Sequence, residues 1–140
     1  MRTYFIPVIV LLTLSLSACA PPRAEMDKKL AKACVSAIRA LSDATDLIEV
    51  QKTVFKNGKA PENVVLRTVK LDVYFTRNQG VMVEKKYTCS YKENLSMFGA
   101  APGFYSLEKD GEKYGNFDGE ILGGIDTLQK IHTATAEAFY

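Results

Sequence analysis

A chain of 140 residues has the usual size of one domain and holds too few residues for two independent hydrophobic cores. Its formal net charge of +2, from 18 basic and 16 acidic residues, provides no strong positive field, so a nucleic-acid partner is not expected. Hydrophobic residues make up 47% of the chain, which argues against a disordered stalk and favours a folded globule.

Residues 1–18 have the pattern of a secretory signal peptide. Arg2 supplies a positive charge, and the largely apolar stretch 4–16 follows it. At about 1.5 Å per helical residue, this stretch is too short to span the roughly 30 Å of a bilayer's hydrocarbon layer. We therefore expect the segment to be removed after export rather than kept as an anchor.

The leader ends with Leu16-Ser17-Ala18-Cys19, which is an aliphatic residue, two small residues and a cysteine. This sequence resembles the lipobox of bacterial lipoproteins, and the resemblance covers the leader alone. It implies transfer of diacylglycerol to the Cys19 thiol, cleavage before Cys19, and acylation of the new amino terminus by a fatty acid such as palmitate. The alternative is an ordinary secretory leader that has a cysteine at its end by chance. Several acyl chains would anchor the protein stably, because each buried CH₂ contributes roughly 0.8 kcal/mol.

Residues 19–25 are expected to form a short lipidated tether. Ala20 follows the cysteine, whereas an aspartate there is typical of enterobacterial lipoproteins kept in the inner membrane, so the resemblance implies the outer membrane, facing the periplasm. Pro21 and Pro22 favour an extended path of about 3.1 Å per residue, which gives a reach of roughly 15 to 20 Å. The single domain, residues 26–140, is thus expected to work close to the bilayer.

An amphipathic helix is predicted from Met26 onward, because apolar residues recur there at intervals of three and four. The apolar stripe consists of Met26, Leu30, Ala33, Cys34, Ala37, Ile38 and Leu41. The opposite side carries Ser36 and the basic residues Lys28, Lys32 and Arg39, with Arg23 just upstream. These four cations either face anionic headgroups or form a plain solvated surface. In the first case, each would contribute on the order of 1 kcal/mol to membrane binding.

Two strands with alternating apolar residues follow, over 65–75 and 81–91. The apolar set of the first strand is Val65, Val69, Leu71, Val73 and Phe75. The apolar set of the second strand is Val81, Val83, Tyr87, Cys89 and Tyr91. Between them, Arg77-Asn78-Gln79-Gly80 is suited to a hairpin turn, since Asn78 and Gly80 tolerate positive φ.

Cys34 and Cys89 are the two cysteines that remain when Cys19 carries lipid. Disulfides persist in an oxidising compartment, and packing the helix stripe on the sheet face would bring the two sulfurs together. The bond would close a loop of about 55 residues, for which the chain-entropy model gives on the order of 4 kcal/mol. A catalytic or metal-binding role of these thiols is the other interpretation, but no CxxC motif or histidine lies near them.

Two further segments are less regular. The stretch 46–56 suits a helix or a strand, and its β-branched residues and the loop 57–62 after it favour a strand. The stretch 94–119 is rich in glycine and aromatic residues, and Asp110-Gly111 is suited to a hairpin turn. The candidate partner surface in this stretch comprises Phe98, Phe104, Tyr105 and Tyr114, with Phe117 nearby. The other interpretation is that these rings close one end of the core.

A final helix is predicted, with Asp118 as its cap, Glu120 in its first turn, and a secure part that begins near Ile125 because Gly123 and Gly124 weaken the start. Its expected apolar face consists of Ile121, Ile125, Leu128, His132, Thr135, Ala136 and Phe139. His132 is the single histidine, and on such a face a histidine is more often a buried structural residue than a catalyst.

No pattern in the sequence identifies a reaction. GxSxG, HExxH, P-loop and EF-hand motifs are absent, and the scattered carboxylates nominate no glycosidase pair. We therefore assign no catalytic residue, metal or cofactor, and an enzyme is disfavoured. A small envelope hydrolase would need His132 beside an acid and a hydroxyl.

The sequence thus predicts one α+β domain with an N-terminal helix disulfide-linked to an antiparallel sheet of three to five strands, and a C-terminal helix. The expected function is that of a membrane-tethered cell-envelope lipoprotein with a non-catalytic interaction or assembly role near the outer membrane. Its expected partners are the membrane, through the lipid anchor, and another envelope protein. The alternative is a small-ligand or inhibitor-binding periplasmic module, which needs an apolar cavity lined by Tyr87, Phe98 or Phe104.

Overall fold

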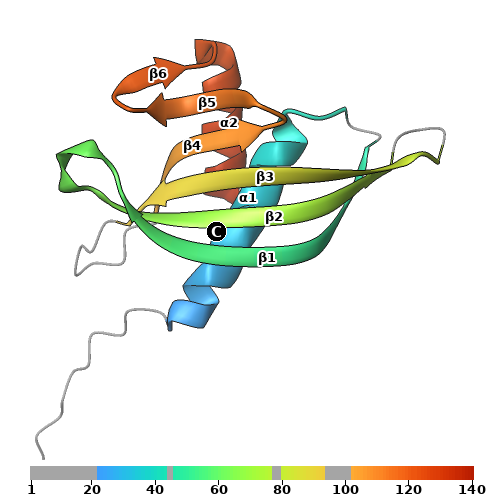
Figure 1. Ribbon diagram of the computed structural model, residues 1–140, viewed down its shortest axis with the longest axis horizontal. Helices are drawn as coiled ribbons and strands as arrows, with labels where there is room; N and C mark the ends of the chain where they lie inside the picture. The colour runs from blue at the N-terminus through green and yellow to red at the C-terminus, as the bar shows by residue number, and fades with distance from the viewer. Residues whose placement is uncertain (1–21, 44–45, 77–79, 94–101) are drawn as a thin grey trace, which may run out of the picture.

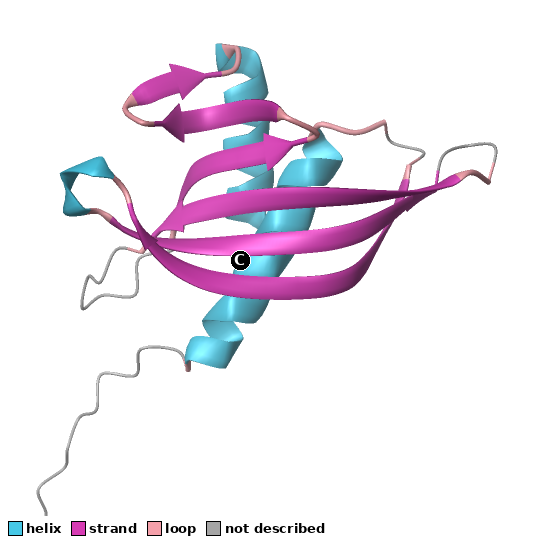
Figure 2. Ribbon diagram, viewed as in Figure 1, coloured by secondary structure: helices cyan, strands magenta, loops and turns pink. Residues whose placement is uncertain are grey.

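The computed structural model describes residues 22–43, 46–76, 80–93 and 102–140. Two helices flank a run of strands in the chain, with a short 3-10 turn, η1, after the first strand (Figure 2). The elements are α1 (Arg23–Ala40), β1 (Leu47–Lys59), η1 (Pro61–Asn63), β2 (Val65–Thr76), β3 (Met82–Lys92), β4 (Gly103–Lys109), β5 (Glu112–Phe117), β6 (Glu120–Leu122) and α2 (Ile125–Glu137).

The strands form one antiparallel sheet in which every strand pairs with its neighbours in the chain, in the order β1-β2-β3-β4-β5-β6. The α+β class is confirmed, but the six strands exceed the three to five that the sequence suggested. The unexpected strand is β6, which occupies the stretch predicted to start the last helix. Asp118 and Gly119 both have positive φ, 53° and 87°, and make a tight turn between β5 and β6 instead of a helix cap.

The strand predictions for the first half of the chain are confirmed. The ambiguous segment is β1, and it continues to Lys59 through half of the expected loop, because Asn57 and Gly58 pair with Arg67 and Leu66 of β2. The β2 and β3 strands pair in the register that the hairpin prediction requires, with Thr76 opposite Met82. The turn residues 77–79 lie outside the described residues. Asp110 and Gly111, with φ of 54° and 84°, form the predicted turn between β4 and β5.

Both helices cover the same face of the sheet, so that the fold has two layers (Figure 1). α1 packs against β1, β2 and β3, and α2 packs against α1. The core between the layers consists of Leu30, Ala33, Cys34, Ala37, Ile38, Val69, Leu71, Val73, Phe75, Tyr87, Cys89, Tyr91, Phe104, Leu107, Ile131 and Ala138. The predicted disulfide between Cys34 and Cys89 is confirmed at the centre of this core, with both residues fully buried and their Cα atoms 5.8 Å apart.

The apolar face predicted for α2 is only partly correct. Thr135 is buried and Phe139 packs against the core as expected, but Ile121 lies in β6, Ile125 is 82% exposed, and Ile131, which was not part of the predicted face, is fully buried. The helix begins at Ile125, where its secure part was expected. Leu128 is half-buried and belongs to both candidate stripes, so the sequence allowed a rotation of the helix about its axis that the packing on α1 does not.

Tyr91 lies at the centre of the packing on β3. Its side chain is fully buried, and the rings of Phe104 and Phe139 meet it edge to face, with centroids 6.3 and 6.4 Å away. Burial raises the pKa of Tyr91, because a phenolate in this apolar surrounding would lose its hydration, and an interaction with the Thr135 hydroxyl opposes this only in part. Tyr91 is therefore a neutral core residue.

Candidate functional site

The described surface has two contrasting ends along α1. At the N-terminal end of the helix, five polar side chains form what we call the polar cluster: Arg23, Asp27, Asn57, Arg67 and Glu93. At the C-terminal end, the start of β1 and the turn end of the β2–β3 pair lie beside the last turn of the helix (Figure 1). α1, which runs from one end to the other, has 18 residues and is about 27 Å long.

The polar cluster joins the first turns of α1 to the sheet. Arg67 of β2 donates two hydrogen bonds to the carboxylate of Asp27, at 3.0 and 2.7 Å, and a third to Asn57 Oδ1 at 2.6 Å. The hydrogen bond with Asp27 raises the pKa of Arg67, so the guanidinium stays charged. Arg23 pairs with Glu93 and donates to Asn57 Oδ1 at 3.1 Å. Each side chain is paired within the cluster, which indicates a structural clamp rather than a reactive site.

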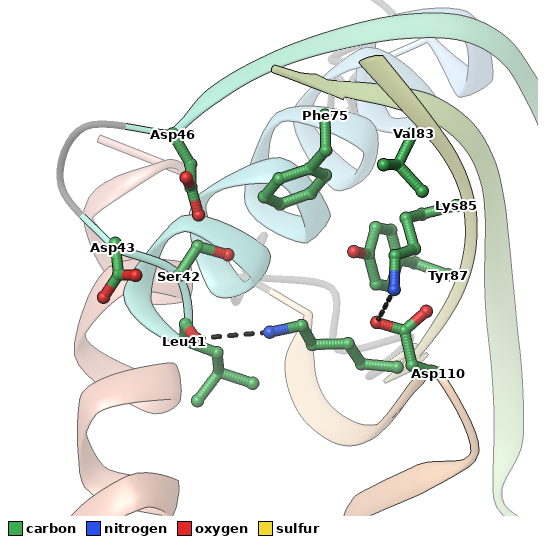
Figure 3. Close-up of a pocket in the computed structure, with 10 residues that line it drawn as sticks. Leu41, Ser42, Asp43, Asp46, Phe75, Val83, Lys85, Tyr87 and Asp110 are labelled. Atoms are coloured by element: carbon green, nitrogen blue, oxygen red, sulfur yellow. Dashed lines mark hydrogen bonds and ion pairs between the residues drawn. The ribbon is translucent and has the colours of Figure 1, made fainter. Parts of the chain in front are cut away.

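A cavity of about 350 Å³ lies at the opposite end, between the end of α1, the turn end of β2 and β3, and the β4–β5 turn (Figure 3). The residues that line it are Leu41, Ser42, Asp43, Asp46, Phe75, Val83, Lys85, Tyr87, Lys109 and Asp110. Phe75 and Tyr87 form its apolar floor, with ring centroids 6.0 Å apart in an edge-to-face contact. The cavity thus combines an apolar floor with charged walls.

The two lysines of the cavity are already engaged. Lys85 pairs with Asp110 at 2.9 Å, and Lys109 donates from Nζ to the carbonyl oxygen of Leu41 at 3.2 Å (Figure 3). The second contact satisfies a carbonyl that the end of α1 leaves without an intrahelical partner. Asp43 and Asp46 have no side-chain hydrogen bond or ion pair with any residue that the structure describes. With three carboxylates against two ammonium groups, the cavity wall carries a net negative charge.

Exposed apolar side chains gather at the same end, on both faces of the sheet. We call this set the apolar tip, and it comprises Leu47 (70% exposed), Val50 (39%), Val81 (58%), Met82 (57%) and Val83 (38%). Leu47 and Met82 both pair across from Thr76 on the face away from the helices, while Val83 pairs with Phe75 on the helix side. Single exposed aliphatic residues are ordinary, but five of them at one end of a sheet mark a candidate interaction surface.

Neither the apolar tip nor the cavity was predicted from the sequence. Val81, Met82 and Val83 form an uninterrupted apolar run where an alternating strand should have a polar residue, and this break in the pattern was the available signal. The cavity left no such signal, because Leu41, Phe75 and Asp110 come from distant parts of the chain.

The predicted aromatic partner surface is divided by the structure. Phe104 is buried against Tyr91, whereas Tyr105 is half-buried with Lys92 Nζ 5.5 Å from its ring centroid. Tyr114 is half-buried and donates to Glu112 at 2.6 Å, while Phe98 lies outside the described residues. Of the three that are described, none is fully exposed.

His132 is exposed rather than buried, which corrects the prediction of a core histidine. Its ring meets the ring of Phe104 edge to face at 5.2 Å. No carboxylate or hydroxyl among the described residues forms a hydrogen bond or ion pair with it, so the arrangement that a hydrolase needs is not assembled there.

All four cations of the predicted basic stripe lie on the surface. Lys28, Lys32 and Arg39 are exposed on α1, and Arg23 is exposed too although it also pairs with Glu93. Contact of these cations with anionic headgroups stays a prediction. Cys19 lies outside the described residues.

Neither a metal cluster nor a spanning helix occurs in the described part of the chain. No group of three or more His, Cys, Asp or Glu side chains is placed to hold a metal ion there. Neither described helix is both long enough and apolar enough to cross a membrane. Comparison of the chain with protein-family models, with curated proteins and with solved structures finds no match.

Proposed function

We propose that this chain is a membrane-tethered cell-envelope lipoprotein whose role is to present an interaction surface, not to catalyse a reaction. The observation that carries the proposal is the apolar tip, because five exposed aliphatic side chains on both faces of one sheet end are costly to leave in water. The partner of this surface is a protein of the envelope, bound during assembly or maintenance of that compartment.

The position of the apolar tip supports a tethered role. α1 begins at Arg23, inside the segment 19–25 that was expected to be the tether, and the polar cluster fixes that end of the helix to the sheet. The tip lies toward the C-terminal end of α1, a helix about 27 Å long, since Val83 lines the same cavity as Leu41. A lipid on Cys19 would therefore hold the polar cluster near the bilayer and leave the tip accessible to a partner.

The tether and its address are tested by metabolic labelling. Cells fed with labelled palmitate should label this protein, and mass spectrometry should find Cys19 as its acylated first residue. Cys19→Ser should remove the label, while Cys34→Ser should retain it, because acylation depends on the leader and not on the folded domain. A Cys34→Ser protein that loses the label, or a leader that stays attached to the wild type, would contradict the anchor. Fractionation should place the wild type in the outer membrane, and recovery in the inner membrane contradicts that part of the proposal.

The interaction surface is tested by a photo-crosslinking residue at position 82 in intact cells, with Lys59 as the control position. Both side chains are exposed strand residues, but Lys59 lies at the far end of β1. An adduct to one defined envelope protein is expected at Met82 and not at Lys59, and Val50→Asp should abolish it. The same adducts at both positions would count against a specific surface at the tip.

The basic stripe offers a secondary contact with the membrane. The Lys28→Ala/Lys32→Ala/Arg39→Ala variant should weaken binding of the full chain to anionic vesicles relative to neutral ones, because each cation near a charged surface contributes on the order of 1 kcal/mol. Unchanged binding would leave these residues as a solvated helix face.

The second candidate function is a small-ligand or inhibitor-binding module, which the cavity favours. Its volume of about 350 Å³ lies at the lower end of the range for small-molecule pockets, and Tyr87 lines it as that alternative requires. Val83→Trp would fill the floor beside Phe75. If native mass spectrometry finds a small molecule bound to the wild type and absent from Val83→Trp, the small-ligand module is favoured over the interaction protein.

A further inference from the structure

The cavity and the apolar tip form one continuous surface, since Val83 belongs to both. Phe75 and Tyr87 form a floor that is almost fully buried, with 6% and 2% of their surface exposed. Val83 at its edge is 38% exposed and therefore accessible. An apolar side chain of a partner that rests on this floor would also meet the tip. A volume of about 350 Å³ holds a few side chains, so the fitting occupant is a short segment rather than a domain face.

The charges of the wall restrict what this segment carries. Lys85 is neutralised by Asp110, whereas Lys109 keeps its charge with its ammonium turned to the Leu41 carbonyl, so beside that ion pair the wall carries the two carboxylates of Asp43 and Asp46 against one cation. Figure 3 shows Asp43 and Asp46 on the opposite wall, across the cavity from the Lys85–Asp110 pair. An acidic segment would meet these two carboxylates with like charge, whereas a lysine or arginine would pair with them.

We propose that this cavity binds a basic–apolar peptide segment of a partner protein, with an apolar side chain on the Phe75–Tyr87 floor and a Lys or Arg side chain at Asp43 and Asp46. The inference rests on the proposed function and names the partner chemistry of its surface. Asp46 is half-buried, so a cation placed there is screened less than at an open surface. An anionic bilayer does not fit this end, because its headgroups would face the same carboxylates.

The test uses the full chain in phosphatidylcholine nanodiscs and a fluorescent heptapeptide of alternating Lys and Val. Two matched peptides replace every Lys by Glu, or every Val by Ser, and binding to empty discs is subtracted. The Lys–Val peptide should bind, and each of the other two should bind at least about fivefold more weakly, because each lacks one half of the recognition. Equal binding of the Glu–Val peptide would overturn the proposal.

The carboxylates are tested by the Asp43→Asn/Asp46→Asn variant, with Asp118→Asn as the matched control in the β5–β6 turn. Asp118 is exposed and has a φ of 53°, a conformation that asparagine tolerates, so the control has the same chemistry at a distant site. The double variant should bind the Lys–Val peptide about fivefold more weakly and lose most of the salt dependence, and the control should bind as wild type. Val83→Lys, which adds a cation to the cavity, should weaken binding as well. Wild-type affinity in both cavity variants would overturn the proposal.

The crosslink at Met82 separates this inference from the proposed function. If the adduct in cells persists unchanged in the Asp43→Asn/Asp46→Asn variant, the tip binds its partner without the cavity carboxylates, and the inference fails while the function stands. If no adduct forms at Met82 but the peptide binds in a manner that depends on Asp43 and Asp46, the cavity site stands and the proposed envelope interaction fails.

Discussion

Arg67 and Asp27 form a two-point clamp between the sheet and α1, with Nε bonded to Oδ1 at 3.0 Å and Nη2 to Oδ2 at 2.7 Å. Their side chains are only 12% and 14% exposed, so removal of one partner leaves the other poorly hydrated and unpaired. We expect Asp27→Asn and Arg67→Met each to lower the free energy of unfolding in urea by about 2 kcal/mol. The control is Lys29→Met, because the Lys29–Glu25 pair is exposed and 3.9 Å apart. It should change that free energy by less than about 0.5 kcal/mol. Losses of equal size in all three variants would contradict a special role of the clamp.

Cys34 and Cys89 should account for a large share of the stability. Their separation of 55 residues gives about 4 kcal/mol by the chain-entropy model when the cross-link is removed. Urea unfolding of Cys34→Ala, Cys89→Ala and the double variant should show similar losses, because either single change already breaks the bond. A double variant that loses the sum of the two single losses would show that side-chain packing, and not the cross-link, carries the effect.

Gly115 should be intolerant of any side chain. Its φ is +98°, and a Cβ atom there would lie 2.4 Å from the carbonyl oxygen of Tyr105 on β4. Gly115→Ala is expected to lower the free energy of unfolding by about 3 kcal/mol, from backbone strain and displacement of β4. Gly103 on β4 has no positive φ, and a Cβ atom there would meet no described atom within 4 Å. Gly103→Ala should change the free energy by no more than about 0.5 kcal/mol in the same thermal or urea titration, and a comparable loss at both positions would refute the steric explanation.

Tyr91 should make the protein sensitive to alkaline pH. Because burial raises its pKa in the folded state, the contribution of the neutral phenol to stability is full below the unfolded value of about 10. Above that pH the unfolded chain releases the proton and the folded chain keeps it, so the free energy of unfolding should fall by about 1.4 kcal/mol per pH unit. Urea titrations from pH 9 to 11 should show a shallower decline in Tyr91→Phe than in wild type. Parallel curves would mean that Tyr91 does not titrate differently in the two states.

The parts of the fold that could be predicted from the sequence are those in which a local pattern of apolar residues is compatible with a single buried face. Alternation over 65–75 and 81–91 defines the central hairpin, and the cysteine in each apolar set defines how α1 sits on it. The buried face of α2 could not be predicted with the same certainty, because its sequence contains two overlapping apolar stripes at helical spacing. One of them runs through Ile125 and His132 and the other through Ile131 and Ala138, and only contact with α1 selects the second.

The candidate site followed from packing that no local pattern contains. The cavity requires the end of α1 at Leu41, the end of β2 at Phe75 and the turn at Asp110 to meet. Conversely, the composition of the aromatic segment predicted a partner surface, whereas Phe104 fills space in the core beside Tyr91. Composition alone does not distinguish a ring that packs inside from one that binds outside.

The order of the strands in the sheet, which is also their order in the chain, determines how the polypeptide assembles as it emerges N-terminus first. Each hairpin closes a short loop and can form at low entropic cost without later residues. α1 is the exception. It emerges first, but its apolar face can pack on β2 and β3, and Cys34 can bond to Cys89, only after residue 89 has been synthesised. Until then the nascent helix is the segment that most needs protection from aggregation and from oxidation with a wrong partner.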